Sequence, residues 1–197
     1  SQRDIQVTVA SSGMSGATNV NLSPVFRNCQ MINHTGNMSS VVVETYTTGN
    51  ITAPEFHQCT FANNVSTNAA GAMWLRGAVD VWADQCKFYN NTSTVNSPIA
   101  GGGAIFLESA MAPPNGPSVT LKAKVTNSIF HHNVATRGGA VYAWVSGQPV
   151  GVYSYLDADF INCTFANNTA QMGSTYFGYL SYGSSKVRLK NCITWGN

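Results

Sequence analysis

The stretch NCTFANN, residues 162–168, recurs along this chain with small changes: QCTFANN stands at 58–64 and QCKFYNN at 85–91. When the Cys of each copy is taken as the origin, six segments align. Their origins are Cys29, Cys59, Cys86, Ser128, Cys163 and Cys192. Subtracting successive origins gives spacings of 30, 27, 42, 35 and 29 residues. Spacings of this size are typical of solenoid repeats.

The columns of this alignment alternate between apolar and polar residues. Apolar residues predominate at seven, five and three positions before the origin, which is the period of a half-buried strand. The position before the origin always holds a carboxamide, in the order Asn28, Gln58, Gln85, Asn127, Asn162 and Asn191. The alternation breaks there, so we predict a bend at this position. A second short strand then starts at the Cys and places a core residue such as Phe165 two positions later.

Another strand is indicated by runs that open with small residues and continue with apolar ones. Examples are GAMWL at 71–75, GGAIFL at 102–107 and GGAVYA at 138–143. Three strands joined by bends return the chain one rung, about 4.8 Å, along the axis. We therefore predict an all-β fold, a right-handed parallel β-helix of about six coils with three short strands per coil. Residues 1–197 form one domain, with an N-terminal strand and loop at 1–21 and the coils at 22–197.

The paired motifs F-x-x-N and G-G-A-[ILV] resemble the repeats of the polymorphic outer-membrane protein (adhesin passenger) families. The motifs are FANN at 61–64 and 165–168, FYNN at 88–91, FHHN at 130–133, GGAI at 102–105 and GGAV at 138–141. The resemblance covers roughly residues 22–197. It implies a β-helix and an adhesive role.

Composition narrows the function classes. Charged residues make up 9% of the chain, against about 25% in an ordinary soluble domain. The net charge of +2 gives no field that would attract nucleic acid. No apolar run approaches 18 residues, so no transmembrane segment is expected. Nine Asn-x-Ser/Thr patterns occur, where about four would arise by chance, and this excess indicates an extracellular or cell-surface glycoprotein.

The nine acceptor patterns are ranked by their places in the repeat. Glycans are expected at Asn37, Asn50, Asn64 and Asn91, because the first two lie in loops and the last two point away from the core. The less favoured positions are Asn21, Asn33, Asn90 and Asn167, of which the last three share the parity of the inward Phe residues. Asn162 is expected to carry no glycan, since its side chain can hydrogen-bond along the carboxamide column.

The five Cys residues share one column. A Cα spacing near 4.8 Å between coils lies inside the disulfide range. Two alternatives follow: a ladder of buried thiols, or at least one disulfide among Cys29–Cys59, Cys59–Cys86 and Cys163–Cys192. No C-x-x-C spacing and no catalytic motif occurs. We therefore predict no metal and no cofactor beyond covalent N-glycans.

The carboxylates bear on whether the chain cleaves polysaccharides, because glycoside hydrolysis needs two free carboxyl groups facing one substrate. The columns place Asp157 between Lys122 and Lys186, and Asp159 between Lys124 and Arg188, so both read as structural pairs. Asp80, Trp82 and Asp84 are the residues that could contact a carbohydrate. His131 and His132 are expected to face opposite sides of a strand.

These features favour a non-enzymatic structural or adhesive secreted glycoprotein. We expect a repeating subunit of an extracellular fibre or coat that assembles head to tail. The ends expected to meet are the strand-like run at 5–10 and the sixth repeat copy, which stops at Gly196–Asn197. The other explanation for these uncapped ends is that the sequence is an excerpt from a longer β-helix. Carbohydrate or a cell surface is the other expected partner, and nucleic acid is not. The alternative is a polysaccharide-binding or polysaccharide-cleaving, pectin-lyase-like β-helix.

Overall fold

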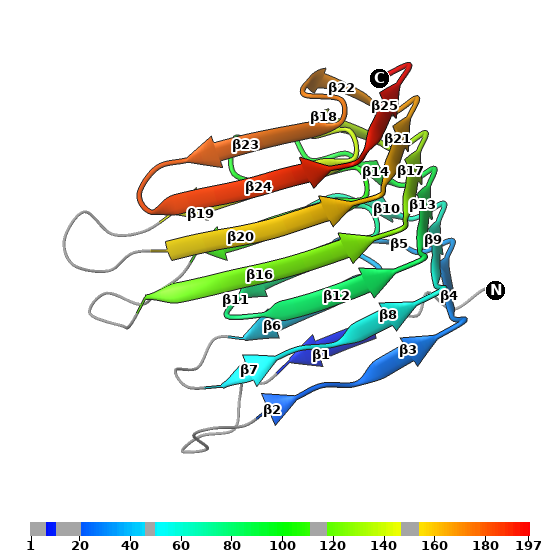
Figure 1. Cartoon of the computed structure of the whole chain (residues 1–197). Coiled ribbons are helices and arrows are strands. Elements are labelled where there is room, and N and C mark those ends of the chain that lie inside the picture. The colour runs from blue at the N-terminus through cyan, green and yellow to red at the C-terminus, as the bar shows by residue number, and fades with distance from the viewer. Residues whose placement is uncertain (1–6, 11–20, 46–49, 111–117, 147–153) are drawn as a thin grey trace.

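The computed structural model describes residues 7–10, 21–45, 50–110, 118–146 and 154–197. These residues form a parallel β-solenoid of about five turns, and the described residues contain no helix. Figure 1 shows the strands lying rung upon rung, with the chain climbing from β2 and β3 at one end to β24 and β25 at the other. The expected all-β solenoid is therefore confirmed.

Four sheets run along the solenoid axis, and they contain the following strands. Sheet A contains β1 (Val7–Ala10), β6 (Val41–Thr45), β11 (Met73–Gly77), β15 (Ile105–Ala110), β19 (Val141–Ser146) and β23 (Tyr176–Leu180). Sheet C contains β3 (Val25–Arg27), β8 (Glu55–His57), β12 (Asp80–Asp84), β16 (Val119–Thr126), β20 (Ser154–Ile161) and β24 (Ser184–Lys190).

Sheets D and E are made of shorter strands. Sheet D contains β4 (Gln30–Ile32), β9 (Thr60–Ala62), β13 (Lys87–Tyr89), β17 (Ile129–His131), β21 (Thr164–Ala166) and β25 (Ile193–Trp195). Sheet E contains β5 (Thr35–Gly36), β10 (Val65–Ser66), β14 (Thr92–Ser93), β18 (Val134–Arg137) and β22 (Thr169–Met172). A small two-stranded sheet pairs β2 (Asn21–Leu22) with β7 (Ile51–Thr52).

The register of the sheets follows the columns of the repeat. Phe88 pairs with Phe61 on one side and with Phe130 on the other, as the alignment predicts. Of the strand expected at 5–10, residues 7–10 are present as β1, which pairs in parallel with β6, and residues 5 and 6 lie outside the described residues. Each full coil has four strands, so the prediction of three strands per coil was wrong. The fourth strand belongs to sheet E. It follows a second bend, and the repeat columns alone do not separate it from the strand of sheet D.

Both bends use a residue with positive φ. The carboxamide column has φ between 50° and 56° in all six copies, from Asn191 to Gln58, which confirms the predicted bend. The second bend lies four positions after the origin, where Asn33, Asn63, Asn90, His132 and Asn167 have φ between 53° and 59°. Asn is among the few L-residues that enter this left-handed region readily. The recurring Asn residues therefore fix the corners of the coil.

The two glycines of the Gly-Gly-Ala motif have different structural roles. Gly102 and Gly138 have φ of 83° and 64° and form the bend into sheet A. The following glycines have no room for a side chain, because a Cβ on Gly103 would lie 2.1 Å from the carbonyl oxygen of Gly139. The first glycine thus supplies a conformation and the second allows close approach of neighbouring coils.

The interior is filled by stacked apolar side chains. Phe61, Phe88, Phe130 and Phe165 lie fully buried in one column. Their ring centroids are separated by 4.6 Å, 4.6 Å and 4.8 Å, with planes within 13° of parallel. Burying rings of this size contributes most of the hydrophobic stabilisation of a narrow core. The column of Phe residues predicted from the repeat is therefore the centre of the fold.

A second internal column consists of asparagines. Asn64, Asn91, Asn133 and Asn168 are all at most 1% exposed. Each side-chain amide donates to the Oδ1 of the next coil, as in Asn91 Nδ2 to Asn133 Oδ1 at 2.9 Å. It also donates to a carbonyl of the preceding coil, as in Asn133 Nδ2 to Phe88 O at 3.0 Å. This asparagine ladder satisfies buried polar groups that sheet pairing leaves open.

Candidate functional site

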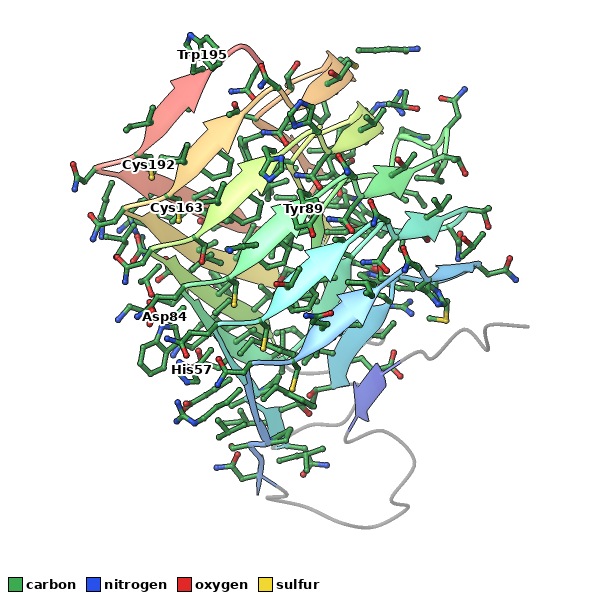
Figure 2. All side chains as sticks on the ribbon, turned by 90° about the vertical axis from the view of Figure 1, so that its right-hand side faces the viewer. His57, Asp84, Tyr89, Cys163, Cys192 and Trp195 are labelled. Atoms are coloured by element: carbon green, nitrogen blue, oxygen red, sulfur yellow. The ribbon has the colours of Figure 1, made fainter. Side chains whose placement is uncertain are left out.

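The outer face of sheet C carries the three residues predicted to contact carbohydrate. Asp80, Trp82 and Asp84 all belong to β12 and point outward, and Trp82 is 38% exposed. His57 lies beside Asp84 in the sheet register, and Figure 2 shows the two side chains together on this face. The structure therefore brings the predicted residues onto one surface, where they lie among basic and imidazole groups.

The indole of Trp82 already has close neighbours. The His57 ring meets it edge-on at 4.9 Å between centroids, and Lys124 Nζ lies 5.6 Å from the ring centroid. Its Nε1 donates to Thr126 Oγ1 at 3.3 Å. These contacts hold the ring in place and occupy part of the surface on which a sugar would stack. Carbohydrate contact at Trp82 stays a prediction.

Asp84 is engaged by neutral donors. Thr126 Oγ1 donates to Oδ1 of Asp84 at 2.5 Å and Asn127 Nδ2 donates to the same oxygen at 2.8 Å. Desolvation raises the pKa of Asp84, but the hydrogen bonds outweigh it and hold the pKa below its usual value. The carboxyl is therefore ionised at neutral pH and hydrogen-bonded to its neighbours.

Asp157 and Asp159 lie in the columns predicted for them. The register pairs Asp157 with Lys122 and Lys186. The closest ion pairs all involve the last coil: Arg188 contacts both aspartates, and Lys190 Nζ lies 3.0 Å from Asp159 Oδ1. The hydrogen bond from Arg188 holds the pKa of Asp159 well below its usual range. Both carboxylates thus form ion pairs with cationic side chains of the last coil.

A groove that the sequence did not reveal lies on the outer face of sheet A. It has a volume of about 320 Å³, and its lining includes Trp74, Arg76, Ile99, Phe106, Glu108 and Trp144. We call it the sheet A groove. It combines indole rings with one carboxylate and one guanidinium group, which is the combination of apolar and polar groups common in ligand sites.

Glu108 is the central polar residue of the sheet A groove. Its side chain is 4% exposed. Trp74 Nε1 donates to Glu108 Oε2 at 2.7 Å, and Arg76 Nε donates to Oε1 at 3.2 Å. Burial raises the pKa of Glu108, whereas the charge of Arg76 opposes the shift. The guanidinium of Arg76 also lies over the Trp74 ring, 4.8 Å from its centroid, so the three side chains hold one another in place.

The sheet A groove exists because a chain segment covers part of an apolar outer face. Val42, Trp74, Phe106 and Tyr142 form a second buried cluster with Ala100. The covering segment is held by Tyr142, whose hydroxyl donates to Pro98 O at 2.5 Å. It is also held by Arg137, whose Nη1 donates to Ser97 O at 2.8 Å.

The sequence carried one signal for this cover. The runs GAMWL and GGAIFL are apolar without alternation, which is typical of strands buried on both faces.

In the structure the cysteine column is a ladder of free thiols without disulfides. All five cysteines are free, and Cys59, Cys86 and Cys163 are buried. Figure 2 shows Cys163 and Cys192 one above the other on successive coils. Ser128 fills the gap in the column, and its Oγ donates to Thr126 O at 2.7 Å. Burial raises the pKa of Cys86 to about 12 and that of Cys163 to about 11, so these thiols are protonated and inert at neutral pH.

The thiol ladder predicts a simple titration result. In the folded protein, a thiol reagent of the disulfide-exchange type should react with Cys29 and Cys192 and spare the three buried cysteines, because burial denies access. After denaturation without reductant, all five thiols should react. A denatured protein that yields three thiols or one would mean that one or two disulfides bridge adjacent coils.

The two adjacent histidines do not face opposite sides, so that prediction was wrong. His132 occupies the second bend with φ of 55°, and this brings its Nδ1 to 2.9 Å from His131 Nδ1. Tyr89 stacks on the other side of His131 at 5.0 Å. Within the described residues, no cluster of three or more His, Cys, Asp or Glu side chains could hold a metal ion.

The structure changes the ranking of the glycan acceptors. Asn64 and Asn91 are buried in the asparagine ladder, so the expectation that they point outward was wrong. The left-handed residue before each of them reverses the strand parity and turns the next side chain inward. Asn50 is 1% exposed, so its predicted surface position was wrong as well. Asn37 is exposed, as predicted.

The structure also changes the ranking of the less favoured glycan acceptors. Asn33, Asn90 and Asn162 are exposed and Asn167 is half-buried, so the parity argument against the residues of the second bend was wrong. The predicted carboxamide column is present: Asn162 Nδ2 donates to Asn127 Oδ1 at 3.2 Å and its own Oδ1 accepts from Asn191 at 2.7 Å. Asn21 is exposed.

Glycopeptide mapping of the protein from its native source tests this ranking. We expect a glycan on Asn37, whose side chain is exposed, and none on Asn64, Asn91 or Asn50. A glycan on a ladder asparagine cannot be accommodated, because its amide nitrogen donates two buried hydrogen bonds. Enzymatic release in heavy-oxygen water followed by mass spectrometry would mark the occupied residues. A labelled Asn91 would contradict the structure.

Comparison with protein-family models gives no match for this chain, and it matches no curated protein and no solved structure. In the part of the chain that the structure describes, no helix is long and apolar enough to span a bilayer. Function is therefore inferred from the fold, the outer face of sheet C and the sheet A groove.

Proposed function

We propose that this chain is a non-enzymatic structural or adhesive glycoprotein that acts outside the cell or at its surface. Its solenoid is a scaffold that needs no cofactor, and its flanks present glycans and a binding surface. We also propose that the solenoid is right-handed and has six coils when the incomplete ones are counted. Parallel strands in one sheet are connected in the right-handed sense in about 98% of cases.

The observation that carries this proposal is the state of the carboxylates. Asp84 accepts from Thr126 and Asn127, Asp159 is bound to Arg188 and Lys190, and Glu108 accepts from Trp74 and Arg76. Glu55 contacts His57 Nε2 at 2.8 Å. A glycosidase needs a carboxylic acid and a second carboxylate free to meet the substrate. Carboxyl groups engaged in this way are suited to stabilising a surface.

The arrangement nearest to an enzyme lies on sheet A. Glu44 and Glu108 flank Arg76 in one outward column. Two rungs separate their Cα atoms by about 10 Å, which is comparable with the carboxyl spacing of inverting glycosidases at about 6.5–9.5 Å. Arg76 stands between them, and its guanidinium is bonded to Glu108. A catalytic pair would need that space for a sugar and a water, so this geometry favours the scaffold.

The assembly part of the proposal concerns the coil formed by β24 and β25. Ile193 and Trp195 are 63% and 70% exposed, and Figure 2 shows Trp195 at this end of the solenoid. In the described chain no strand pairs with the far edge of β23, β24 or β25. We propose that a further rung of parallel strands, supplied by a second copy, covers this edge and extends the solenoid head to tail.

Light scattering and electron microscopy of the native protein test this proposal. We expect rods that lengthen with protein concentration, and shorter ones after Trp195→Glu places a charge on the outer face beside the open edge of β25. The intact mass of the polypeptide in the same sample distinguishes two sources of the further rung. The rung can come from a second copy of the chain, or from more sequence of the same polypeptide. Particles of one length at every concentration would contradict head-to-tail assembly.

A further inference from the structure

We infer that the sheet A groove binds an uncharged saccharide, with one pyranose ring stacked on Trp144. This inference rests on the proposed adhesive role and gives that role a ligand class. It concerns a surface separate from the outer face of sheet C, where Trp82 is already engaged by His57 and Lys124.

The apolar contact would come from Trp144 and Ile99. Trp144 is partly exposed and is paired in register with Glu108. Ile99 is 45% exposed and also lines the groove. By contrast, Trp74 is 6% exposed and lies beneath the Arg76 guanidinium. Trp144 is therefore the accessible indole of the groove, and a flat C–H face such as that of a pyranose suits an aromatic ring.

The polar contacts favour hydroxyl groups over charged groups. Glu108 accepts one hydrogen bond on each oxygen, whereas a carboxylate has about four acceptor sites. A ligand hydroxyl could donate to a remaining site. Glu108 and Arg76 also cancel each other's formal charge at the floor of the groove. An anionic ligand would meet Glu108 and a cationic ligand would meet Arg76, so an uncharged ligand avoids both repulsions.

The size of the groove limits how much of the saccharide it holds. Its volume of about 320 Å³ lies at the lower end of the range for ligand sites, about 300–1,000 Å³. This space suits one or two sugar rings of a longer chain. A shallow contact of this size gives weak affinity for one site, on the order of 0.1–1 mM. Repetition of the site along an assembled fibre would raise the avidity.

Calorimetric titration of the folded protein with cellohexaose, xylohexaose, maltohexaose and hexagalacturonate tests the inference. We expect at least one of the three neutral oligosaccharides to bind, and hexagalacturonate to bind at least ten-fold more weakly. Trp144→Ala should weaken binding at least ten-fold, because it removes the stacking surface. The matched control is Tyr155→Ala, an aromatic side chain that is 41% exposed on the outer face of sheet C, which should leave the affinity unchanged. Thermal melts would confirm that both variants are folded.

Several outcomes would overturn the inference. These are the absence of binding by all three neutral probes, preference for hexagalacturonate, and affinity that Trp144→Ala leaves unchanged or that Tyr155→Ala weakens equally. Mass spectrometry of the probes after titration separates this inference from the proposed function. Shortened oligosaccharides would overturn the non-enzymatic role, whereas intact probes without binding would overturn only the assignment of the groove.

Discussion

Replacing Asn133 by Ala is expected to lower the free energy of unfolding by about 3–5 kcal/mol. Asn133 is fully buried, and its Oδ1 accepts from both the backbone N–H and the side-chain amide of Asn91. The substitution leaves these two buried donors without partners, at about 1–3 kcal/mol each. It also removes the donors to Phe88 O and Asn168 Oδ1 and leaves a small cavity.

Equilibrium unfolding in urea measures this loss, and Asn63→Ala is the matched control. Asn63 is exposed in the second bend and makes its side-chain contacts at the surface. Its replacement loses the left-handed preference of Asn, at about 1 kcal/mol. If the free energy of unfolding of Asn133→Ala lies within 1 kcal/mol of that of the unchanged protein, the asparagine ladder does not stabilise the solenoid as described.

The second large effect is expected for Phe88→Ala, at about 3–5 kcal/mol of destabilisation. Phe88 is fully buried and stacks on Phe61 and Phe130 at 4.6 Å on each side. Removing the ring leaves a cavity between two coils, and the neighbouring rings are fixed by strand pairing and cannot close it. The stack would therefore be interrupted in the middle of the solenoid.

Tyr89→Ala provides the control for Phe88→Ala in the same strand. Tyr89 points to the outer face, where it stacks on His131, so its loss should cost about 1 kcal/mol. Unfolding followed by circular dichroism and by tryptophan fluorescence gives both values. Equal losses for the two variants would contradict the assignment of Phe88 to the interior and of Tyr89 to the outer face.

Much of the fold could be predicted from the repeat because stacking converts an alignment column into a spatial column. The Phe column, the cysteine column and the bend at the carboxamide all follow from residues that recur at fixed distances from the origin. The opposite charges placed around Asp157 and Asp159 also follow from register alone. In these cases each residue's environment is set by its counterpart one coil away.

Apart from the burial of Asn50, the errors in the sequence interpretation have one common cause. Counting alternation through the second bend assumes a continuous strand, but a left-handed residue at Asn63 or Asn90 shifts the following side chain to the other face. For that reason Asn64 and Asn91 were assigned to the surface and His132 was placed opposite His131. The motif Asn-Asn has two roles: the first Asn makes the bend and the second joins the internal ladder.

The sheet A groove could not be derived from the repeat, because its cover is not repeated. Val95 packs against the second apolar cluster, and Ser97, Ile99 and Ala100 line the groove. They belong to the longer connection between Cys86 and Ser128, where the spacing is 42 residues. An insertion in one coil creates contacts that no other coil has. Its unusual length, together with the unbroken apolar runs of sheet A, was the available sign that this part of the surface differs.

The most direct test of the scaffold is incubation of the purified protein with polygalacturonan, xylan, mixed-linkage β-glucan and alginate. Soluble products would be analysed by mass spectrometry against an enzyme-free blank. Because the well-placed carboxylates are bound to Arg188, Arg76 and neutral donors, we predict that no oligosaccharide is released above the blank. Release above the blank from any of these polymers would contradict a non-enzymatic role.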